Sequence, residues 1–182
     1  MLGRPCVAIV GSRHPTPYGE RVARDLSGAL ASAGACIVSG LAFGIDAIAH
    51  RAALAAGGVT AAVLGAGIDT VYPRSHVSLY EEIARYGVVL SEFAAGVGTF
   101  QGCFPRRNRI IAGLCRLTIV VEAGAKSGSL ITAGYAGDFG RNIAAVPGPI
   151  DSEQSAGTNQ LLRDGAQVIA TIDDALALAD LA

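Results

Sequence analysis

The sequence predicts an α/β domain built on a doubly wound, mostly parallel sheet with helices on both faces. Short apolar runs alternate with helix-like segments along the chain. The runs are apolar at consecutive positions, which is typical of parallel strands that are covered on both faces. Most of them end at glycine, serine or a charged residue, as expected where loops leave the carboxyl edge of a sheet. At 182 residues, the chain is long enough for one domain with a substantial core.

Seven apolar runs are predicted to be strands, because each is short and most are followed by turn-forming or charged residues. In order, they are Cys6–Val10, Ala35–Val38, Val59–Leu64, Gly87–Leu90, Leu117–Val121, Asn142–Val146 and Gln167–Ala170. No change of composition marks an internal linker. Residues 1–182 are therefore expected to form a single Rossmann-like domain.

Six segments are predicted to be helices: Thr16–Ala33, Ile45–Ala56, Val77–Arg85, Arg107–Leu114, Leu130–Phe139 and Ile172–Leu181. The first places Val22, Leu26 and Leu30 on one face at helical spacing. The second is rich in alanine and carries Asp46 in its first turn. A carboxylate at that end stabilises a helix through its interaction with the helix dipole. The fourth follows Pro105, a residue type suited to the first turn of a helix.

Composition excludes several classes of protein and site. The formal net charge is -1, which argues against general electrostatic adhesion to nucleic acid or lipid. No apolar run approaches the roughly 18 residues of a membrane span, and no signal peptide is evident, so a cytoplasmic protein is expected. The four cysteines form no C-x-x-C pair and only three histidines are present, so no metal site is expected.

The stretch from Cys103 to Gly113 is the most informative part of the chain. It places Arg106, Arg107, Asn108 and Arg109 in direct succession in a protein with only 14 lysines and arginines. Arginines in the first turn of a helix oppose the helix dipole. A bound anion would relieve that conflict and use the free backbone N–H groups, although a solvated basic turn would look the same.

Other candidate anion-binding residues follow the predicted strands, at the carboxyl edge where parallel sheets bind ligands. They are Gly11, Ser12 and Arg13; Ser39, Gly40, Phe43 and Gly44; Arg74; and Lys126, Ser127, Gly128 and Ser129. Six positive charges (Arg13, Arg74, Arg106, Arg107, Arg109 and Lys126) are expected to converge on this one rim. The aromatic rings of Phe43, Phe100 and Phe104 could stack on unpaired bases there, or could cover the core.

Known catalytic and cofactor motifs fit the sequence poorly. No G-x-G-x-x-G follows the first strand, and Ala125 replaces the glycine that a Walker A loop needs before its lysine. Asp46, Asp69, Glu92 and Glu122 could act as acids or bases, or could cap helices and pair with the arginines. No catalytic residue, cofactor or enzymatic activity is therefore expected.

An ordered set of motifs resembles the core of the DNA-processing protein A (DprA/Smf) family. The set comprises Gly11-Ser12-Arg13, Ser39-Gly40-Leu-Ala-Phe-Gly44-Ile-Asp46, Ala49-His50, Tyr72-Pro73, Phe104-Pro-Arg-Arg-Asn-Arg-Ile-Ile-Ala-Gly113, Glu122, Ser127-Gly-Ser-Leu-Ile-Thr132-Ala, Val146-Pro147-Gly148 and Gly157-Thr-Asn159-Gln-Leu-Leu-Arg-Asp-Gly165-Ala166. The resemblance covers roughly residues 6–176. His76, Ala94, Thr99 and Cys115 depart from the usual pattern of the family.

The resemblance implies a cytoplasmic protein that binds single-stranded DNA, protects incoming strands during natural transformation and loads the RecA recombinase. It implies DNA-binding roles for Arg13, Arg74 and the Phe104–Arg109 segment, whereas the role of Lys126 is inferred from its place on the rim. The resemblance does not extend to the small helical domain and the winged helix that many members carry, so we expect either an excised core or a short member of the family. The alternative is a nucleotide phosphoribohydrolase of the LOG group, although its P-G-G-x-G-T-x-x-E motif is missing.

Two further expectations concern assembly and stability. Family resemblance and the apolar C-terminal third predict a homodimer that uses Leu161, Leu162 and Ile169, unless these residues fill the core of the chain. Arg13 and Arg107 are both expected to be exposed. Replacing either with alanine is therefore expected to weaken DNA binding with little loss of stability.

Overall fold

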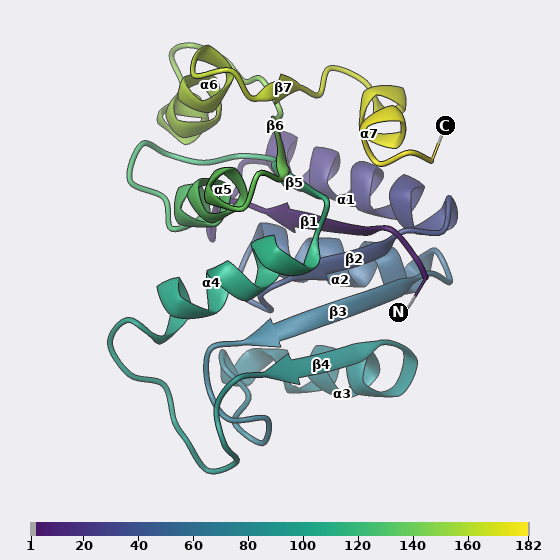
Figure 1. Ribbon diagram of the computed structural model, residues 1–182, viewed down its shortest axis with the longest axis vertical. Helices are drawn as coiled ribbons and strands as arrows, with labels where there is room; N and C mark the ends of the chain where they lie inside the picture. The colour runs from purple at the N-terminus through teal and green to yellow at the C-terminus, as the bar shows by residue number, and fades with distance from the viewer. Residues whose placement is uncertain (1–2, 182) are drawn as a thin grey trace.

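The computed structural model describes residues 3–181, and it confirms the predicted fold class. All strand pairs are parallel, in a seven-stranded sheet of order β4-β3-β2-β1-β5-β6-β7. The strands are β1 Cys6–Val10, β2 Cys36–Ser39, β3 Val59–Leu64, β4 Val88–Ser91, β5 Leu117–Val120, β6 Asn142–Ala145 and β7 Gln167–Val168. Their carboxyl ends lie at one edge of the sheet, and both chain ends lie near the opposite edge (Figure 1).

Helices cover both faces of this sheet. The helices are α1 Pro17–Ser32, α2 Ile45–Ala55, α3 Val77–Tyr86, α4 Cys103–Leu114, α5 Ser129–Asp138, α6 Ala156–Arg163 and α7 Ile172–Leu178, with short 3-10 turns η1 Arg74–His76 and η2 Glu153–Ser155. Figure 1 shows α1, α2 and α3 behind the sheet and α4 and α5 in front of it. Among the described residues, no helix is long and apolar enough to span a membrane.

The core has a separate layer on each face of the sheet. Val7 and Ile9 of β1 face α1, α2 and α7, while Ala8 and Val10 face α4 and α5. Because successive residues of a strand point to opposite faces, a strand buried on both sides is expected to be apolar at most positions. This is why the consecutive apolar runs predicted the sheet correctly.

Two predicted elements differ from the structure, and one helix was not predicted. Helix α4 begins at Cys103, four residues before the predicted start, with Gly102 at its N-cap in the left-handed conformation (φ 87°). Helix α6 was not predicted, and β7 is only two residues long. The early start of α4 matters most, because it places Arg106 on the same helix as Arg107 and Arg109.

Candidate nucleic-acid interface

A hollow lies where the order of the strands reverses. β1 pairs with both β2 and β5, so the loops that follow β1 and β5 diverge and leave a crevice between them. Its cavity volume is about 590 Å³, within the usual range for small-molecule sites. We call this hollow the switch-point pocket; it is lined by Val10, Gly11, Ser12, Arg13, Ala42, Asp46, Phe104, Pro105, Arg107, Asn108, Ile111, Gly124, Lys126, Ser127, Gly128, Ser129, Ile131, Thr132 and Gln154.

The loop after β1 forms one wall of the pocket and is tightly held. The amide of Ser12 donates to the carbonyl of Glu122 at 2.6 Å, and the Ser12 carbonyl accepts from the amide of Ile45 at 3.1 Å. Gly44 has a φ of 72°, and a side chain there would strike the backbone of Ser12 and Arg13. The backbone beside Arg13 is thereby fixed, while the Arg13 side chain remains exposed.

Arg107 is buried, with only 4% of its surface exposed. Its Nη1 atom donates to the carbonyls of Gly40, at 2.5 Å, and Val63. Gly40 makes this possible, because a Cβ atom there would collide with the guanidinium group. The expectation of an exposed Arg107 with little structural role is therefore wrong: the side chain joins α4 to the carboxyl ends of β2 and β3.

Asp46 is the buried acidic counterpart of Arg107. Its Oδ2 atom accepts hydrogen bonds from the amides of Gly40, at 3.0 Å, and Ala42, at 3.4 Å. Burial raises the pKa of Asp46, and the positive charge of Arg107 and these amides oppose that rise. Burial also lowers the pKa of Arg107, an effect that the charge of Asp46 opposes. The two side chains thus compensate each other's charge around Gly40, as a structural pair.

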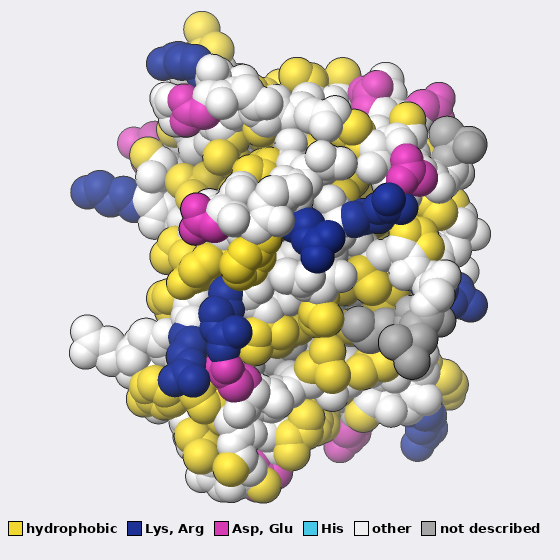
Figure 2. Space-filling model, viewed as in Figure 1, with side chains coloured by type: hydrophobic (Ala, Val, Ile, Leu, Met, Phe, Trp, Pro, Cys, Tyr) yellow, Lys and Arg dark blue, Asp and Glu magenta, His cyan; other side chains and the backbone are white. Residues whose placement is uncertain are grey.

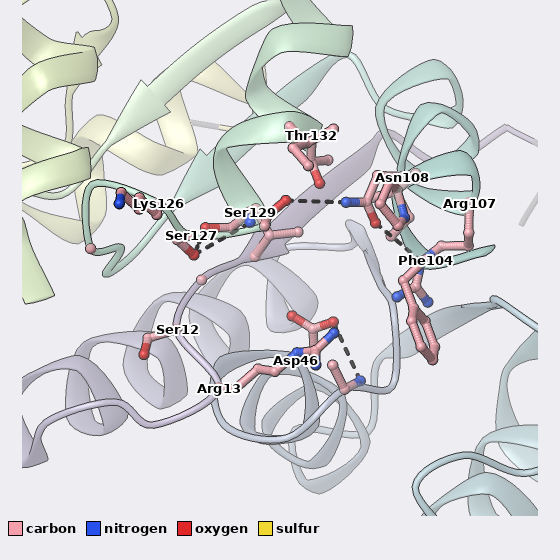
Figure 3. A pocket seen from close by; sticks show the side chains of 18 of the residues that line it. Ser12, Arg13, Asp46, Phe104, Arg107, Asn108, Lys126, Ser127, Ser129 and Thr132 are labelled. Carbon is pink, nitrogen blue, oxygen red and sulfur yellow. Dashed lines mark hydrogen bonds between the residues drawn. The ribbon is translucent and has the colours of Figure 1, made fainter. Parts of the chain in front are cut away.

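The opposite wall of the pocket is the loop between β5 and α5. Asn108 of α4 reaches this loop, where its amide nitrogen donates to the Gly128 carbonyl at 3.2 Å. The hydroxyls of Ser127 and Ser129 lie 2.8 Å apart at the start of α5. Figure 3 shows Lys126 at one end of the pocket and Phe104 with Arg107 at the other, with the two serines between them.

Aromatic side chains lie beside the pocket. The guanidinium of Arg13 stands 5.6 Å from the ring centre of Phe104, whose ring lies 5.4 Å from that of Tyr72. Phe43 contacts the ring of His76 edge-on and is 43% exposed. A small adjoining hollow is lined by Arg13, Gly40, Ala42, Phe43, Tyr72, Pro73, Phe104 and Arg107. Flat, partly exposed rings therefore continue from the pocket toward Phe43.

Several predicted residues do not line the switch-point pocket, and three of the six predicted cations, Arg74, Arg106 and Arg109, are among them. Arg106 and Arg109 project from another face of α4 and both pair with Glu92. Arg74 is exposed in η1. The Ser39 hydroxyl donates to the Ile9 carbonyl at 2.7 Å within the sheet, and Phe100 packs edge-on against Phe93.

Other residues of the pocket were missed by the sequence analysis. Gln154 arrives from η2 after β6, and its side-chain oxygen accepts from the Ser12 hydroxyl at 3.2 Å. Thr132 and Ile111 line the wall between α4 and α5. Helical spacing from Ser129 and from Asn108 would have indicated both, because residues three positions apart share a helix face. No sequence signal indicated Gln154, which lies in an irregular segment.

The acidic residues at the strand ends act as structural partners, one of the two roles considered for them. Glu122 accepts from the amide and the hydroxyl of Thr16, at 2.8 and 2.6 Å, and Thr16 is the N-cap of α1. Asp69 accepts from the amide of Gly96. Within residues 3–181, no group of three histidine, cysteine, aspartate or glutamate side chains could hold a metal ion.

The residues predicted for a dimer surface differ in burial. Leu161 and Leu162 of α6 are partly buried, and Leu161 packs against the core layer beneath α4 and α5. Ile169 is only 3% exposed and belongs to the core layer beneath α1 and α7. Its side chain is therefore covered by its own chain.

The sequence is similar to one protein family. The family model of DNA recombination-mediator protein A matches residues 1–180. The Smf protein of Synechocystis is 48% identical over 173 residues, which cover 95% of this chain and 44% of that protein. The chain therefore spans less than half of that relative.

Two solved structures share the fold closely. DNA processing protein A of Streptococcus pneumoniae has a TM-score of 0.89 and 44% identity, over 96% of this chain and 61% of that one. The corresponding protein of Helicobacter pylori, whose structure addresses its single-stranded DNA binding mode, has a TM-score of 0.88 and 35% identity. That match covers 97% of this chain and 80% of the other.

Proposed function

The chain belongs to the DNA recombination-mediator protein A family, and from this membership and the geometry of its site we propose that it binds single-stranded DNA. The proposed site is the switch-point pocket, with Arg13 and Lys126 as the cations that contact phosphates. Phe104 and Tyr72 would stack on unpaired bases. The observation that carries the proposal is the position of Arg13, Lys126 and Phe104 around one crevice at the carboxyl edge of the sheet, with Tyr72 in the adjoining hollow.

Charge supports an anionic ligand in the pocket. Lys126 and Arg13 are exposed, whereas the acidic lining residue Asp46 is buried beside Arg107. α5 starts at Ser129, beside the hydroxyls of Ser127 and Ser129, and the amino ends of helices attract phosphates. A polyanion approaching the pocket therefore meets two exposed cations and the hydroxyls of Ser127 and Ser129.

The shape of the pocket supports an unpaired strand over a duplex. A volume of about 590 Å³ admits a nucleotide whose base is free, but the bases of a duplex stay paired inside the helix. Aromatic rings beside a basic groove are typical of proteins that bind single strands without sequence preference. Nothing in the site favours the nucleotide phosphoribohydrolase alternative, because Glu122 and Asp46 are engaged by backbone and capping contacts.

Fluorescence anisotropy with labelled single strands and a duplex of equal length tests this function. We expect the single strand to bind more tightly, and its affinity to fall with salt because phosphate contacts release counterions. Equal affinity for both forms, or binding that is insensitive to salt, would overturn the proposal. Thr171→Ala, which alters the cap of α7 and does not line the pocket, serves as a control for general loss of structure.

Family membership also supports a role in recombination and DNA uptake within the cytoplasm. We propose that the chain protects incoming strands and passes them to the RecA recombinase. Strand exchange by RecA on strands coated with a competing single-strand binding protein tests this, and we expect the chain to stimulate it. Absence of stimulation by a chain that binds DNA normally would remove this part of the proposal.

We further propose a homodimer through α6, because Leu161 and Leu162 remain partly exposed there. A symmetric contact would place two pockets on one particle, and linked sites gain avidity when one strand reaches both. Light scattering at micromolar concentration should give the mass of a dimer. A monomer mass for the native chain, unchanged by Leu162→Glu, would contradict it.

A further inference from the structure

A second cationic site lies on the face of α4 that points away from the switch-point pocket. Arg106 and Arg109 are one helical turn apart, so their side chains share a face. Arg107 and Asn108, which line the pocket, point in other directions around the same helix. On the surface that carries α4, Figure 2 shows Lys and Arg side chains gathered around an acidic side chain near the beginning of that helix.

The acidic side chain in this cluster is Glu92, which follows β4. One carboxylate oxygen accepts from Nε of Arg106 at 3.0 Å, and the other accepts from Nη2 of Arg109. One carboxylate therefore bridges two guanidinium groups through separate oxygens. A phosphate group can occupy the same position, because it also offers two oxygens to such a pair.

The backbone around Glu92 is held in place. The Ser91 hydroxyl accepts from the amide of Phe93 at 3.0 Å and donates to the Ala66 carbonyl at 2.6 Å. The guanidinium of Arg106 also lies 5.4 Å from the ring centre of Phe93. The backbone that carries Glu92 and the guanidinium of Arg106 are therefore positioned by contacts with neighbouring residues.

The cluster is nevertheless open to solvent. The side chains of Arg106, Arg109 and Glu92 are 57%, 40% and 27% exposed. Ion pairs in such surroundings contribute little to stability, so a competing anion can replace the carboxylate at small cost. The charges of Arg106 and Arg109 also keep the pKa of Glu92 below its usual value, although partial desolvation opposes them.

We propose that Arg106 and Arg109 form a second phosphate-binding position and that Glu92 occupies it as a built-in competitor in the free protein. The inference rests on the proposed function, because the ligand is a backbone phosphate of the strand bound in the switch-point pocket. A strand that fills the pocket and continues around α4 displaces the carboxylate. Glu92 thus weakens binding of longer strands and leaves short ones unaffected.

Glu92→Gln tests the proposal, since glutamine keeps the shape of the side chain and removes its charge. We expect the affinity for a long single strand to rise about twofold to fivefold. The slope of log affinity against log salt should steepen by about 0.7, the value for one added phosphate contact on a single strand. Glu81→Gln, an exposed position on α3, makes the same change of net charge elsewhere and should have little effect.

Two further variants separate the proposal from its alternatives. Adding Arg106→Gln and Arg109→Gln to Glu92→Gln should abolish the gain, and a strand just long enough to bind should show no gain. Weaker or unchanged binding by Glu92→Gln, with normal binding by the native chain, would overturn the proposal. It would mean that Glu92 orients the arginines or has no role. Failure of the native chain to bind any single strand would instead overturn the proposed function itself.

Discussion

The two sides of α4 carry arginines in opposite physical states. On the pocket side, Arg107 is 4% exposed and donates to two backbone carbonyls. On the other side, the side chain of Arg106 is 57% exposed and shares Glu92 with Arg109. A buried guanidinium is costly to leave unpaired, whereas an exposed one is easily exchanged. The comparison indicates that the buried arginine builds the site and the exposed arginines are available to a ligand.

The largest effect is expected for Arg107→Ala. Its loss would leave the buried Asp46 without a compensating charge and two carbonyls without a donor, so we expect a destabilisation of about 3 kcal/mol or more. Arg107→Lys should recover little of it, because a lysine cannot reproduce the fork of guanidinium donors. Urea denaturation measures the free energy of unfolding of both variants. A loss below about 1 kcal/mol for Arg107→Ala would break the comparison.

Gly40→Ala should disturb the same contact from its other side. The added methyl group would collide with the guanidinium of Arg107 and push it away from its carbonyl partners. Overpacking of this kind costs about 1–3 kcal/mol. Gly28→Ala on α1, where a Cβ atom would meet nothing within 4 Å, is the matched control and should not destabilise the fold. Equal stability of the two variants would contradict the close packing of Arg107.

Removing an exposed pocket cation should affect binding and not stability. We expect Arg13→Ala and Lys126→Ala each to lower the affinity for a single strand about tenfold, which is the loss of one charged hydrogen bond. Thermal denaturation should remain close to that of the native chain. Arg85→Ala, exposed on α3, is the control for a lost positive charge and should bind almost normally. A similar loss for all three variants would indicate a diffuse charge effect and no defined site.

The smallest stability effect is expected on the exposed side of α4. Arg109→Ala removes one half of a partly exposed ion pair, so the change should stay within about 1 kcal/mol. Urea denaturation of both variants compares the loss of unfolding free energy in Arg109→Ala with that in Arg107→Ala. A destabilisation by Arg109→Ala as large as that of Arg107→Ala would erase the distinction between the two sides.

The sequence was sufficient to predict the strands of the sheet but not helix α6. β1 is buried on both faces and is apolar throughout, and β5 is apolar except at Thr118, a pattern that few other structures produce. Helix α6 was missed because Gly157, Thr158 and Asn159 favour helices weakly. Tertiary contacts support it instead: the Gly157 amide donates to the Ala123 carbonyl at 2.7 Å.

The sequence was sufficient to predict which loops form the site, but not that Arg107 is buried. Arg13 and the Lys126–Ser129 loop follow strands at the switch point, so strand order alone places them together. Consecutive arginines on a helix diverge, because each residue turns the helix through about 1/3.6 of a circle. Which of them enters the core depends on a neighbour without a side chain, Gly40, which lies 67 residues away in the sequence.

Chemical-shift mapping by NMR tests the central claim most directly. A short single strand is titrated at low salt into the isotopically labelled native chain, and the backbone amides that shift are assigned. We predict the largest shifts at Gly11–Arg13, Gly124–Ser129 and the first turn of α4, with little change along α1 and α3. Chemical-shift changes that are confined to other surfaces would contradict binding of the strand in the switch-point pocket. So would an absence of changes under conditions where fluorescence anisotropy reports binding.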